Sequence, residues 1–192
     1  MKVLGIVCSP RKGGNTEIMV TEALAVAREA GLETELILAA GKKIAPCDGC
    51  EACAKSGVCK IKDDMQPIYQ QLEAADAIIF GTPVYFGNVS AQGKAIIDRT
   101  YAIRRQRKLA GKVAAAVVVA RRVGAGQVRT LLSAFFVVQG MIAVRGAIGY
   151  GRDKGAVREG IGGSEGLTAM DEARNVGQNV VQMLKRLPPP TG

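Results

Sequence analysis

Short apolar runs alternate with longer segments of mixed polarity along the chain. The runs that predict strands are Lys2 to Cys8, Glu33 to Leu38, Ala77 to Phe80, Val113 to Ala120 and Met141 to Val144. Continuous apolar runs are typical of parallel strands that helices cover on both faces. Glu33 to Leu38 alternates between polar and apolar residues instead, which is typical of a strand at the margin of a sheet.

The segments between these runs carry apolar residues at helical spacing. The predicted helices run from Thr16 to Ala30, from a cap at Asp63 to Ala75, onward from a cap at Ser90, from Gln127 to Gln139, and from Leu167 to Leu187. Gly31 can end the first helix, because glycine readily adopts the left-handed conformation that closes one. The glycine-rich segment from Gly146 to Gly166 lacks such spacing, and we predict that it is irregular and mobile.

This alternation of strands and helices predicts an α/β fold. Five strands favour a doubly wound parallel sheet with helices on both faces over a barrel, which needs eight. Ligands of such sheets bind at the carboxyl ends of the strands, where the strand order reverses. With 192 residues, 48% of them hydrophobic, we expect one domain over residues 1–187, which includes a cysteine loop at residues 46–62, and a flexible tail at residues 188–192.

The charge balance is basic, with 26 Lys and Arg against 17 Asp and Glu. Many of these cations lie between Arg99 and Lys112, and Arg121, Arg122 and Arg129 follow. Four Phe, four Tyr and no Trp give few stacking platforms for bases, so we expect no nucleic-acid partner. An anionic cofactor explains the charge better, and steering of acidic redox partners is a weaker inference.

The sequence pattern predicts neither a membrane span nor an export signal. No apolar run reaches the roughly 18 residues that a membrane helix needs. The first residues resemble neither a secretory signal nor a twin-arginine leader, so we expect a cytoplasmic protein with no membrane partner.

Four of the five cysteines lie in one short motif, and the chain contains no histidine. The motif is Cys47-x2-Cys50-x2-Cys53-x5-Cys59. Four closely spaced thiolates can ligate one small inorganic core, so we interpret this motif as an iron-sulfur loop. Without histidine, Ser-His-Asp hydrolysis and Cys-His proteolysis are excluded, whereas redox chemistry carried by a cofactor is not.

Other interpretations of the cysteines remain open. A structural zinc site usually takes its thiolates from two separated Cys-x2-Cys pairs, which differs from this spacing. Disulfides are not expected without a secretory signal. A loop of bare thiols is the third alternative. Cys8 ends an apolar run, and we expect it to be a buried small hydrophobic residue.

The turn after the first predicted strand has the composition of a phosphate-binding loop. It offers glycines for close backbone approach, hydroxyl groups, and the free N–H groups of a helix start, which favour an anion. The candidate residues are Ser9, Arg11, Gly13, Gly14, Asn15 and Thr16. The loop matches neither the Walker A nor the dinucleotide-binding fingerprint, and the alternative is an ordinary surface turn.

Two further turns follow buried strands and are candidates for contacts with a flat ring. The first offers aromatic side chains beside glycine, and its candidate residues are Pro83, Val84, Tyr85, Phe86, Gly87 and Asn88. The second follows the valine-rich strand and offers Ala120 and Arg121. Alternatively, Tyr85 and Phe86 pack under the loop or into a subunit contact, and Arg121 is solvated surface.

The phosphate loop, the Gly81 to Gly87 turn and the cysteine motif together resemble the iron-sulfur flavoprotein family. This family sits among the flavodoxin-like NAD(P)H-dependent FMN reductases, and the likeness spans nearly the whole chain. The resemblance implies that Ser9, Arg11, Asn15 and Thr16 hold the FMN phosphate, that Pro83 to Asn88 line the isoalloxazine, and that Cys47, Cys50, Cys53 and Cys59 ligate a [4Fe-4S] cluster. It also implies homodimers or tetramers in which a cluster lies near a neighbouring subunit's flavin.

The function predicted on this basis is electron transfer between FMN and the cluster. The donor would be ferredoxin or NAD(P)H, and the acceptor a quinone, an oxygen species or a protein. No side-chain acid or base is needed as a catalyst. One alternative is a cluster-free NAD(P)H-dependent FMN or quinone reductase whose cysteine loop is structural or binds zinc. Another is a regulatory module that senses redox state through its thiols.

Overall fold

The computed structural model describes residues 1–188, so of the predicted tail only Pro188 is among the described residues. The strands are β1 (Lys2–Val7), β2 (Glu33–Leu38), β3 (Ala77–Pro83), β4 (Val113–Ala120), β5 (Ile142–Ala143) and β6 (Ala147–Tyr150). The helices are α1 (Asn15–Glu29), α2 (Ala52–Ser56), α3 (Met65–Ala74), α4 (Ala91–Arg99), α5 (Tyr101–Arg104), α6 (Ala125–Val138) and α7 (Ala169–Arg186), with a 3-10 helix η1 (Ala156–Arg158).

The strands form one parallel sheet in the order β2-β1-β3-β4-β5, with β6 also paired to β4. β5 pairs with the start of β4 and β6 with its end, so the two occupy one edge position. The five expected positions are therefore present, and the fifth strand is broken in two. A Cβ on Gly146 would stand 2.4 Å from the carbonyl oxygen of Ala116, so the break needs a glycine. The prediction that the whole Gly146 to Gly166 segment is irregular is wrong for β6.

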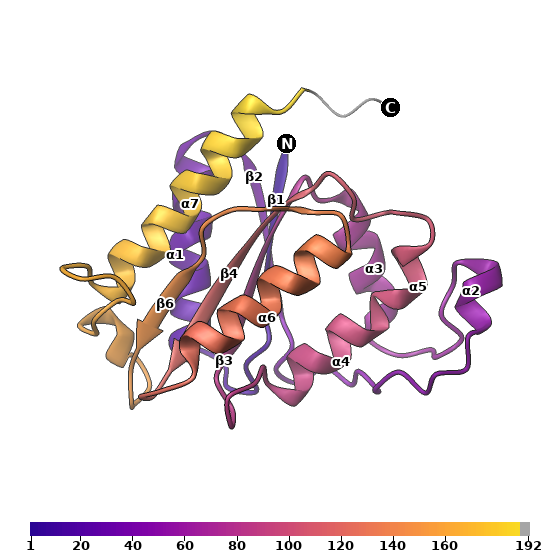
Figure 1. Ribbon diagram of the computed structural model, residues 1–192, viewed down its shortest axis with the longest axis horizontal. Helices are drawn as coiled ribbons and strands as arrows, with labels where there is room; N and C mark the ends of the chain where they lie inside the picture. Colours follow the sequence, from indigo (N-terminus) through magenta and orange to yellow (C-terminus); the bar gives the residue numbers. More distant parts are fainter. Residues whose placement is uncertain (189–192) are drawn as a thin grey trace.

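Helices cover both faces of the sheet, as predicted (Figure 1). α1 and α7 pack on one face, and α3, α4 and α6 pack on the other. Every residue of β4 is buried, and its side chains alternate between the two helical layers. Val113 and Ala115 face the α1 and α7 layer, whereas Ala114 and Ala116 face the opposite one. A strand buried on both sides explains why this run is apolar at every position.

The predicted helix starts agree with the structure to different degrees. The cap at Ser90 is confirmed, because its side chain accepts a hydrogen bond from the N–H of Gly93 at 3.0 Å. α3 begins at Met65 rather than directly after Asp63. Asp63 does accept the N–H of Met65 at 3.1 Å, but both of its oxygens also bond the Arg99 guanidinium. α6 starts two residues earlier than predicted, and the short helices α2 and α5 were not predicted.

The carboxyl ends of β1, β3, β4 and β6 meet at the lower edge of Figure 1. The order reverses between β1 and β3, because β1 pairs with β2 on one side and β3 on the other. This switch point is where doubly wound sheets bind ligands. Within residues 1–188, no helix combines the length and the apolar composition that a bilayer crossing requires.

Candidate functional site

A crevice of about 490 Å³ opens at the switch point, and we call it the switch-point crevice. It is lined by Ser9, Arg11, Gly14, Asn15, Thr16, Pro83, Val84, Tyr85, Phe86, Val119, Ala120, Arg121, Gly151, Arg152 and Lys154. These residues come from the turns after β1, β3, β4 and β6, which the sheet brings together. The volume lies within the range of about 300–1,000 Å³ that is usual for small-molecule sites.

The turn after β1 is shaped as an anion cradle. The Ser9 hydroxyl accepts the N–H of Arg11 at 3.1 Å, and Gly13 has φ +64°. α1 then begins at Asn15, where the N–H groups of the first turn have no intrahelical acceptor. Five of the six predicted phosphate-loop residues line the crevice. Gly13 does not, because its N–H donates to the carboxylate of Glu17 at 2.6 Å, and it supports the turn instead.

Asn15 joins the phosphate loop to a segment that was not predicted to take part. Its Nδ2 donates to the carbonyl of Asp153 at 2.8 Å, and its Oδ1 accepts the N–H of Gly155 at 2.7 Å. This latch holds Gly151, Arg152 and Lys154 against the crevice. A Cβ on Gly13 would stand 3.1 Å from the Lys154 ammonium nitrogen, so this cation lies over the cradle.

The turn after β3 is tight and strained. Tyr85 and Asn88 exchange two backbone hydrogen bonds of 2.9 and 3.0 Å, and the residues between them, Phe86 and Gly87, have φ +50° and +73°. Positive φ at both central positions is typical of a type I′ turn. A bulky residue in this conformation is an outlier, and such outliers gather at functional sites. Phe86 is fully exposed at the mouth of the crevice.

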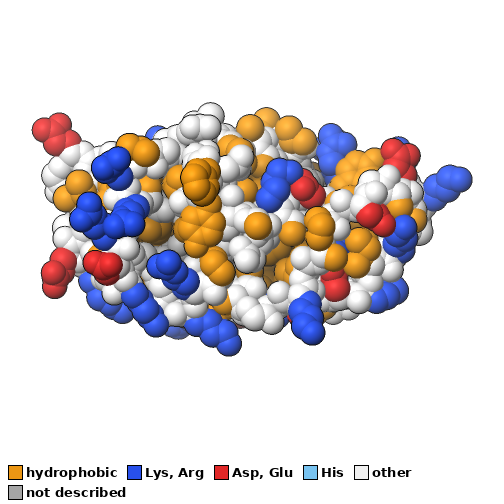
Figure 2. All heavy atoms as spheres, turned by 90° about the horizontal axis from the view of Figure 1, so that it is seen from below, with side chains coloured by type: hydrophobic (Ala, Val, Ile, Leu, Met, Phe, Trp, Pro, Cys, Tyr) orange, Lys and Arg blue, Asp and Glu red, His pale blue; other side chains and the backbone are white. Residues whose placement is uncertain are grey.

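The predicted ring-binding residues divide between three positions. Pro83, Val84, Tyr85, Phe86, Ala120 and Arg121 line the crevice. Gly87 lines an adjoining hollow of about 450 Å³ that also contains Arg122 and Arg152. Asn88 turns back on its own loop, where its side-chain oxygen accepts the N–H of Val89 at 2.8 Å. Figure 2 shows Lys and Arg side chains around a central apolar area on this face of the molecule.

The four clustered cysteines line one hollow of about 530 Å³, which we call the cysteine hollow. Asp98 at the end of α4 and Tyr101 at the start of α5 complete its wall. Cys47 and Cys50 are exposed, Cys53 is half-buried and Cys59 is buried, and all are free thiols. Within residues 1–188 no three cysteine or carboxylate side chains lie close enough to hold one metal ion. The four cysteines of the motif therefore surround one hollow, but their side chains do not converge on a single metal position.

Charged groups in the cysteine hollow shift the pKa values of their neighbours. Lys60 forms an ion pair with Asp48 at 3.0 Å and, together with a contact from Cys50, lowers the pKa of Asp48 to about 2. Burial raises the pKa of Cys53, and the neighbouring thiolates add to that increase. A bound cation would reverse this effect, because it stabilises thiolates. Cys8 lies elsewhere, is fully buried, and has a thiol pKa raised by burial, as expected of an inert core residue.

The two regions have no lining residue in common. α4 connects them, because its cap Ser90 bonds the carbonyl of Cys8 behind the phosphate loop and its end reaches the cysteine hollow. A helix of nine residues is about 14 Å long. α4 therefore links the strand end behind the phosphate loop to the wall of the cysteine hollow.

Comparison with known proteins gives consistent matches. A family model described as NADPH-dependent FMN reductase matches residues 1–154. An iron-sulfur flavoprotein of Methanocaldococcus jannaschii is 40% identical over 196 residues, which cover 96% of this chain and 98% of that protein. An iron-sulfur flavoprotein of Methanosarcina thermophila is 44% identical over 75% of this chain and 77% of its own length. A NAD(P)H dehydrogenase (quinone) of Deinococcus radiodurans is 32% identical over 71% and 68%.

Solved structures share the fold. RosB with a bound intermediate, 8-demethyl-8-formylriboflavin-5'-phosphate, superposes with a TM-score of 0.73 at 16% identity, covering 100% of this chain and 82% of that one. A flavodoxin from the domain Archaea gives 0.62 at 15% identity, with 96% and 99% covered. These likenesses confirm the predicted flavodoxin-like α/β architecture.

Proposed function

This chain belongs to the iron-sulfur flavoproteins of the NADPH-dependent FMN reductase family, and from that premise we propose that it exchanges electrons between FMN in the switch-point crevice and a [4Fe-4S] cluster in the cysteine hollow. Family membership makes it a flavin-dependent oxidoreductase that uses FMN. The cluster, the route of the electrons and the identity of donor and acceptor belong to the proposal.

The crevice fits FMN in shape and chemistry. Ser9, Gly14 and Thr16 surround the start of α1, which favours a phosphate. Arg11 and Lys154 add positive charge at the same end of the crevice. Pro83 to Phe86 form an apolar and aromatic wall suited to a flat ring, and the backbone there is held by the bond from the N–H of Val84 to the carbonyl of Val119 at 2.8 Å. This arrangement is the observation that carries the flavin half of the proposal.

The cysteine hollow fits a four-thiolate group by its donor set. Cys47, Cys50, Cys53 and Cys59 face one space, and none is consumed by a disulfide. Because the thiols do not converge on one point here, binding would draw the exposed part of the loop inward. Cys59 is already buried and would change least. The donor set supports the cluster half of the proposal.

When bound, FMN supplies two-electron chemistry as a hydride acceptor and one-electron chemistry as a carrier, whereas a cluster carries one electron at a time. The chain's own residues bind and orient these groups, and because the cofactors carry the electrons no side-chain acid or base is needed as a catalyst. The arginines beside the crevice are suited to an anionic donor, either NAD(P)H or an acidic protein such as ferredoxin. A quinone, an oxygen species or a protein would accept the electrons.

Anaerobic purification followed by cofactor analysis tests this function. We expect about one FMN per chain and, for a [4Fe-4S] group, about four iron and four sulfide. Visible absorbance near 400 nm should fall on reduction. Protein that is saturated with FMN but contains neither iron nor sulfide would contradict the cluster half and leave the flavin half standing.

A second candidate is a cluster-free NAD(P)H-dependent FMN or quinone reductase. The lack of three converging ligands among the described residues favours it, as does similarity to a quinone-reducing dehydrogenase. The cysteine loop would then be structural or would bind zinc. Because zinc sites are colourless, metal analysis combined with the visible spectrum separates the two functions.

We further propose that the chain acts as a cytoplasmic homo-oligomer, a dimer or a tetramer. Phe86, Val137 and Val138 are large apolar side chains exposed to solvent, and association would cover such surface. Free thiols at all five cysteines suit a reducing compartment. Light scattering coupled to size exclusion should give a mass of two or four chains, and a monomer at micromolar concentration would contradict the association.

A further inference from the structure

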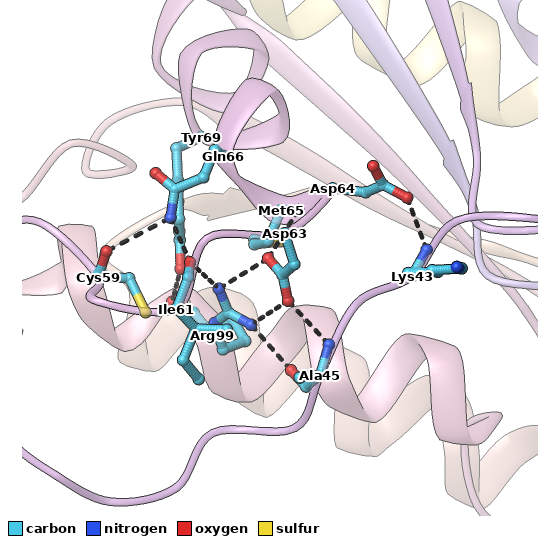
Figure 3. A network of polar contacts seen from close by, with 10 residues as sticks. All are labelled: Lys43, Ala45, Cys59, Ile61, Asp63, Asp64, Met65, Gln66, Tyr69 and Arg99. Atoms are coloured by element: carbon cyan, nitrogen blue, oxygen red, sulfur yellow. Dashed lines mark hydrogen bonds and ion pairs between the residues drawn. The ribbon is translucent and has the colours of Figure 1, made fainter.

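The largest fully buried side chain among the described residues is charged: it is Arg99, the last residue of α4. Only 1% of it is exposed, and its guanidinium forms an ion pair with Asp63 at 2.8 Å (Figure 3). The remaining nitrogen, Nε, has no hydrogen-bond partner in the described part of the chain. Burying such a pair sacrifices hydration, and apolar residues of similar size often serve stability equally well. An arginine at this position therefore calls for a reason beyond stability.

The contacts of Arg99 join the two ends of the cysteine loop. One terminal nitrogen donates to the carbonyl of Ala45 at 2.9 Å, and the other donates to the carbonyl of Ile61 at 3.3 Å. Ala45 precedes Cys47 by two residues, and Ile61 follows Cys59 by two. Segments on either side of all four cysteines are thus attached to one guanidinium.

Asp63 and α3 complete this base. The Asp63 carboxylate accepts the N–H of Ala45 at 2.8 Å, so the same ion pair bonds both the backbone N–H and the backbone carbonyl of Ala45. From α3, Gln66 donates to the carbonyls of Cys59 at 3.3 Å and Ile61 at 2.6 Å, and the Tyr69 hydroxyl donates to the carbonyl of Arg99 at 3.0 Å. Figure 3 shows Ala45, Ile61 and Asp63 around the guanidinium, with Gln66 bonding the carbonyls of Cys59 and Ile61 beside it.

The middle of the loop is held far less. Cys47 and Cys50 are exposed, and the ion pair of Lys60 with Asp48 lies at the surface. Arg105 donates to the carbonyl of Ala54 at 3.3 Å, again in an exposed position. The loop therefore has a rigid base and an open middle.

We propose that Arg99, paired with Asp63, is a positioning residue for the cysteine cluster. It brings the first and last cysteines to one hollow before iron arrives, so that the entropy of closing the loop is lost on folding rather than on binding. Its buried positive charge also offsets the negative charge of a thiolate-ligated group. Partners that orient ligands in this way typically affect metal retention about 10–100-fold. This inference rests on the cluster proposed above.

Hydrogen exchange in the iron-free wild-type protein tests the rigid base without any substitution. The amide of Ala45, bonded to Asp63, should exchange at least about tenfold more slowly than the amide of Gly49 in the exposed middle of the loop. Equal rates at the two amides would overturn the proposal, because the loop would then have no preformed base.

Iron retention in variants provides the second test. Reconstituted Arg99→Leu should lose iron to an excess of chelator about 10–100-fold faster than wild type. Arg186→Leu is the matched control, because it removes an exposed arginine at the end of α7, on the other face of the sheet from the cysteine hollow, and it should release iron at the wild-type rate. Melting temperature and FMN content report whether each variant folds.

A double variant distinguishes loss of the positioning role from misfolding caused by an unpaired buried charge. Arg99→Met with Asp63→Leu removes both charges and so leaves no unpaired buried charge, and it should fold yet release iron as fast as Arg99→Leu. Iron release within twofold of wild type in either folded variant would overturn the positioning role. Should the wild-type chain take up no iron at all, the proposed cluster fails, and the exchange rates of Ala45 and Gly49 still decide whether the loop has a preformed base at the Arg99 and Asp63 pair.

Discussion

The switch-point crevice and the cysteine hollow differ in what holds them. The crevice stands on the ends of β1, β3, β4 and β6, and the hydrogen bonds of the sheet position its turns. The cysteine hollow stands on a loop whose regular structure is the five-residue helix α2, and only its base is pinned, through Arg99. A site on a rigid scaffold can be ready before its ligand arrives. A site on a loop must be drawn together by the ligand and by a few long-range contacts.

Removing one thiol should have the largest effect on one region and none on the other. Cys50→Ser should reduce bound iron to a trace while FMN content stays at the wild-type level, because the two regions share no lining residue. Cys50 is exposed, so the change should cost little stability. Iron and flavin analysis after anaerobic purification gives both numbers. Cys8→Ala is the control, since this buried cysteine lies outside the motif, and full iron in Cys50→Ser would remove Cys50 from the ligand set.

A substitution that strains the phosphate loop should have the opposite result, with weaker FMN binding and unchanged iron content. Gly13→Val places a branched side chain at φ +64° and 3.1 Å from the Lys154 ammonium, with a strain of about 1–3 kcal/mol. FMN affinity should fall at least about tenfold, which corresponds to 1.4 kcal/mol, while iron content stays unchanged. Fluorescence titration with FMN measures the loss.

Gly31→Val is the matched control for this strain. Gly31 has φ +81° at the far end of α1, and a Cβ there meets open space. It should lower stability by a similar amount and leave FMN affinity near wild type. Equal affinity losses in both variants would mean that Gly13 acts through folding alone.

A smaller effect should come from the segment after β6. Lys154→Met removes the cation that lies over the phosphate loop, and we expect FMN to bind about fivefold more weakly, or about 1 kcal/mol. The loss should shrink at high salt, because an exposed charge is screened. Lys94→Met, on α4 and outside the crevice, should bind FMN normally. Unchanged affinity in Lys154→Met would show that Asn15 latches this segment without placing its charge.

Much of the crevice could be predicted from sequence, because its turns follow unmistakable buried strands. β6 and the segment after it could not be predicted, because their high glycine content is typical of a loop. Those glycines are needed for close packing: a Cβ on Gly149 would stand 2.4 Å from the Met19 sulfur, and one on Gly160 would stand 2.2 Å from the carbonyl oxygen of Tyr150. Composition cannot distinguish glycines that permit tight packing from glycines that loosen a chain.

The cysteine hollow was predicted at the level of its donors and missed at the level of its support. Spacing identified Cys47 to Cys59, but Arg99 belongs to a run of cations that was attributed to a cofactor. Arg99 is buried, and it bonds Ala45 and Ile61, which lie 54 and 38 residues before it in the sequence. Periodicity reports which face of a helix is apolar, and it carries no signal for a single long-range ion pair.

The smallest expected effect on the two sites comes from outside both of them, at the start of α7. The Thr168 hydroxyl accepts the N–H of Asp171 at 3.1 Å in a capping box, and the N–H of Ala169 donates to the carbonyl of Gly160 at 2.8 Å. Thr168→Ala should lower the free energy of unfolding by about 1 kcal/mol in urea titrations at pH 7. Iron content should not change, because the cysteine hollow lies on the other side of the sheet from α7.

The pH dependence of that loss can be worked out from Asp171. The Thr168 hydroxyl, followed by the Thr168 N–H, lowers the pKa of Asp171 below its ordinary 3.8. A lowered carboxyl pKa contributes stability that is complete above the unfolded value and disappears as pH falls through the folded one. The difference between wild type and Thr168→Ala should therefore be constant near neutral pH and shrink below about pH 3.8. A difference that grows in acid would show that the capping box does not stabilise α7 through its carboxylate.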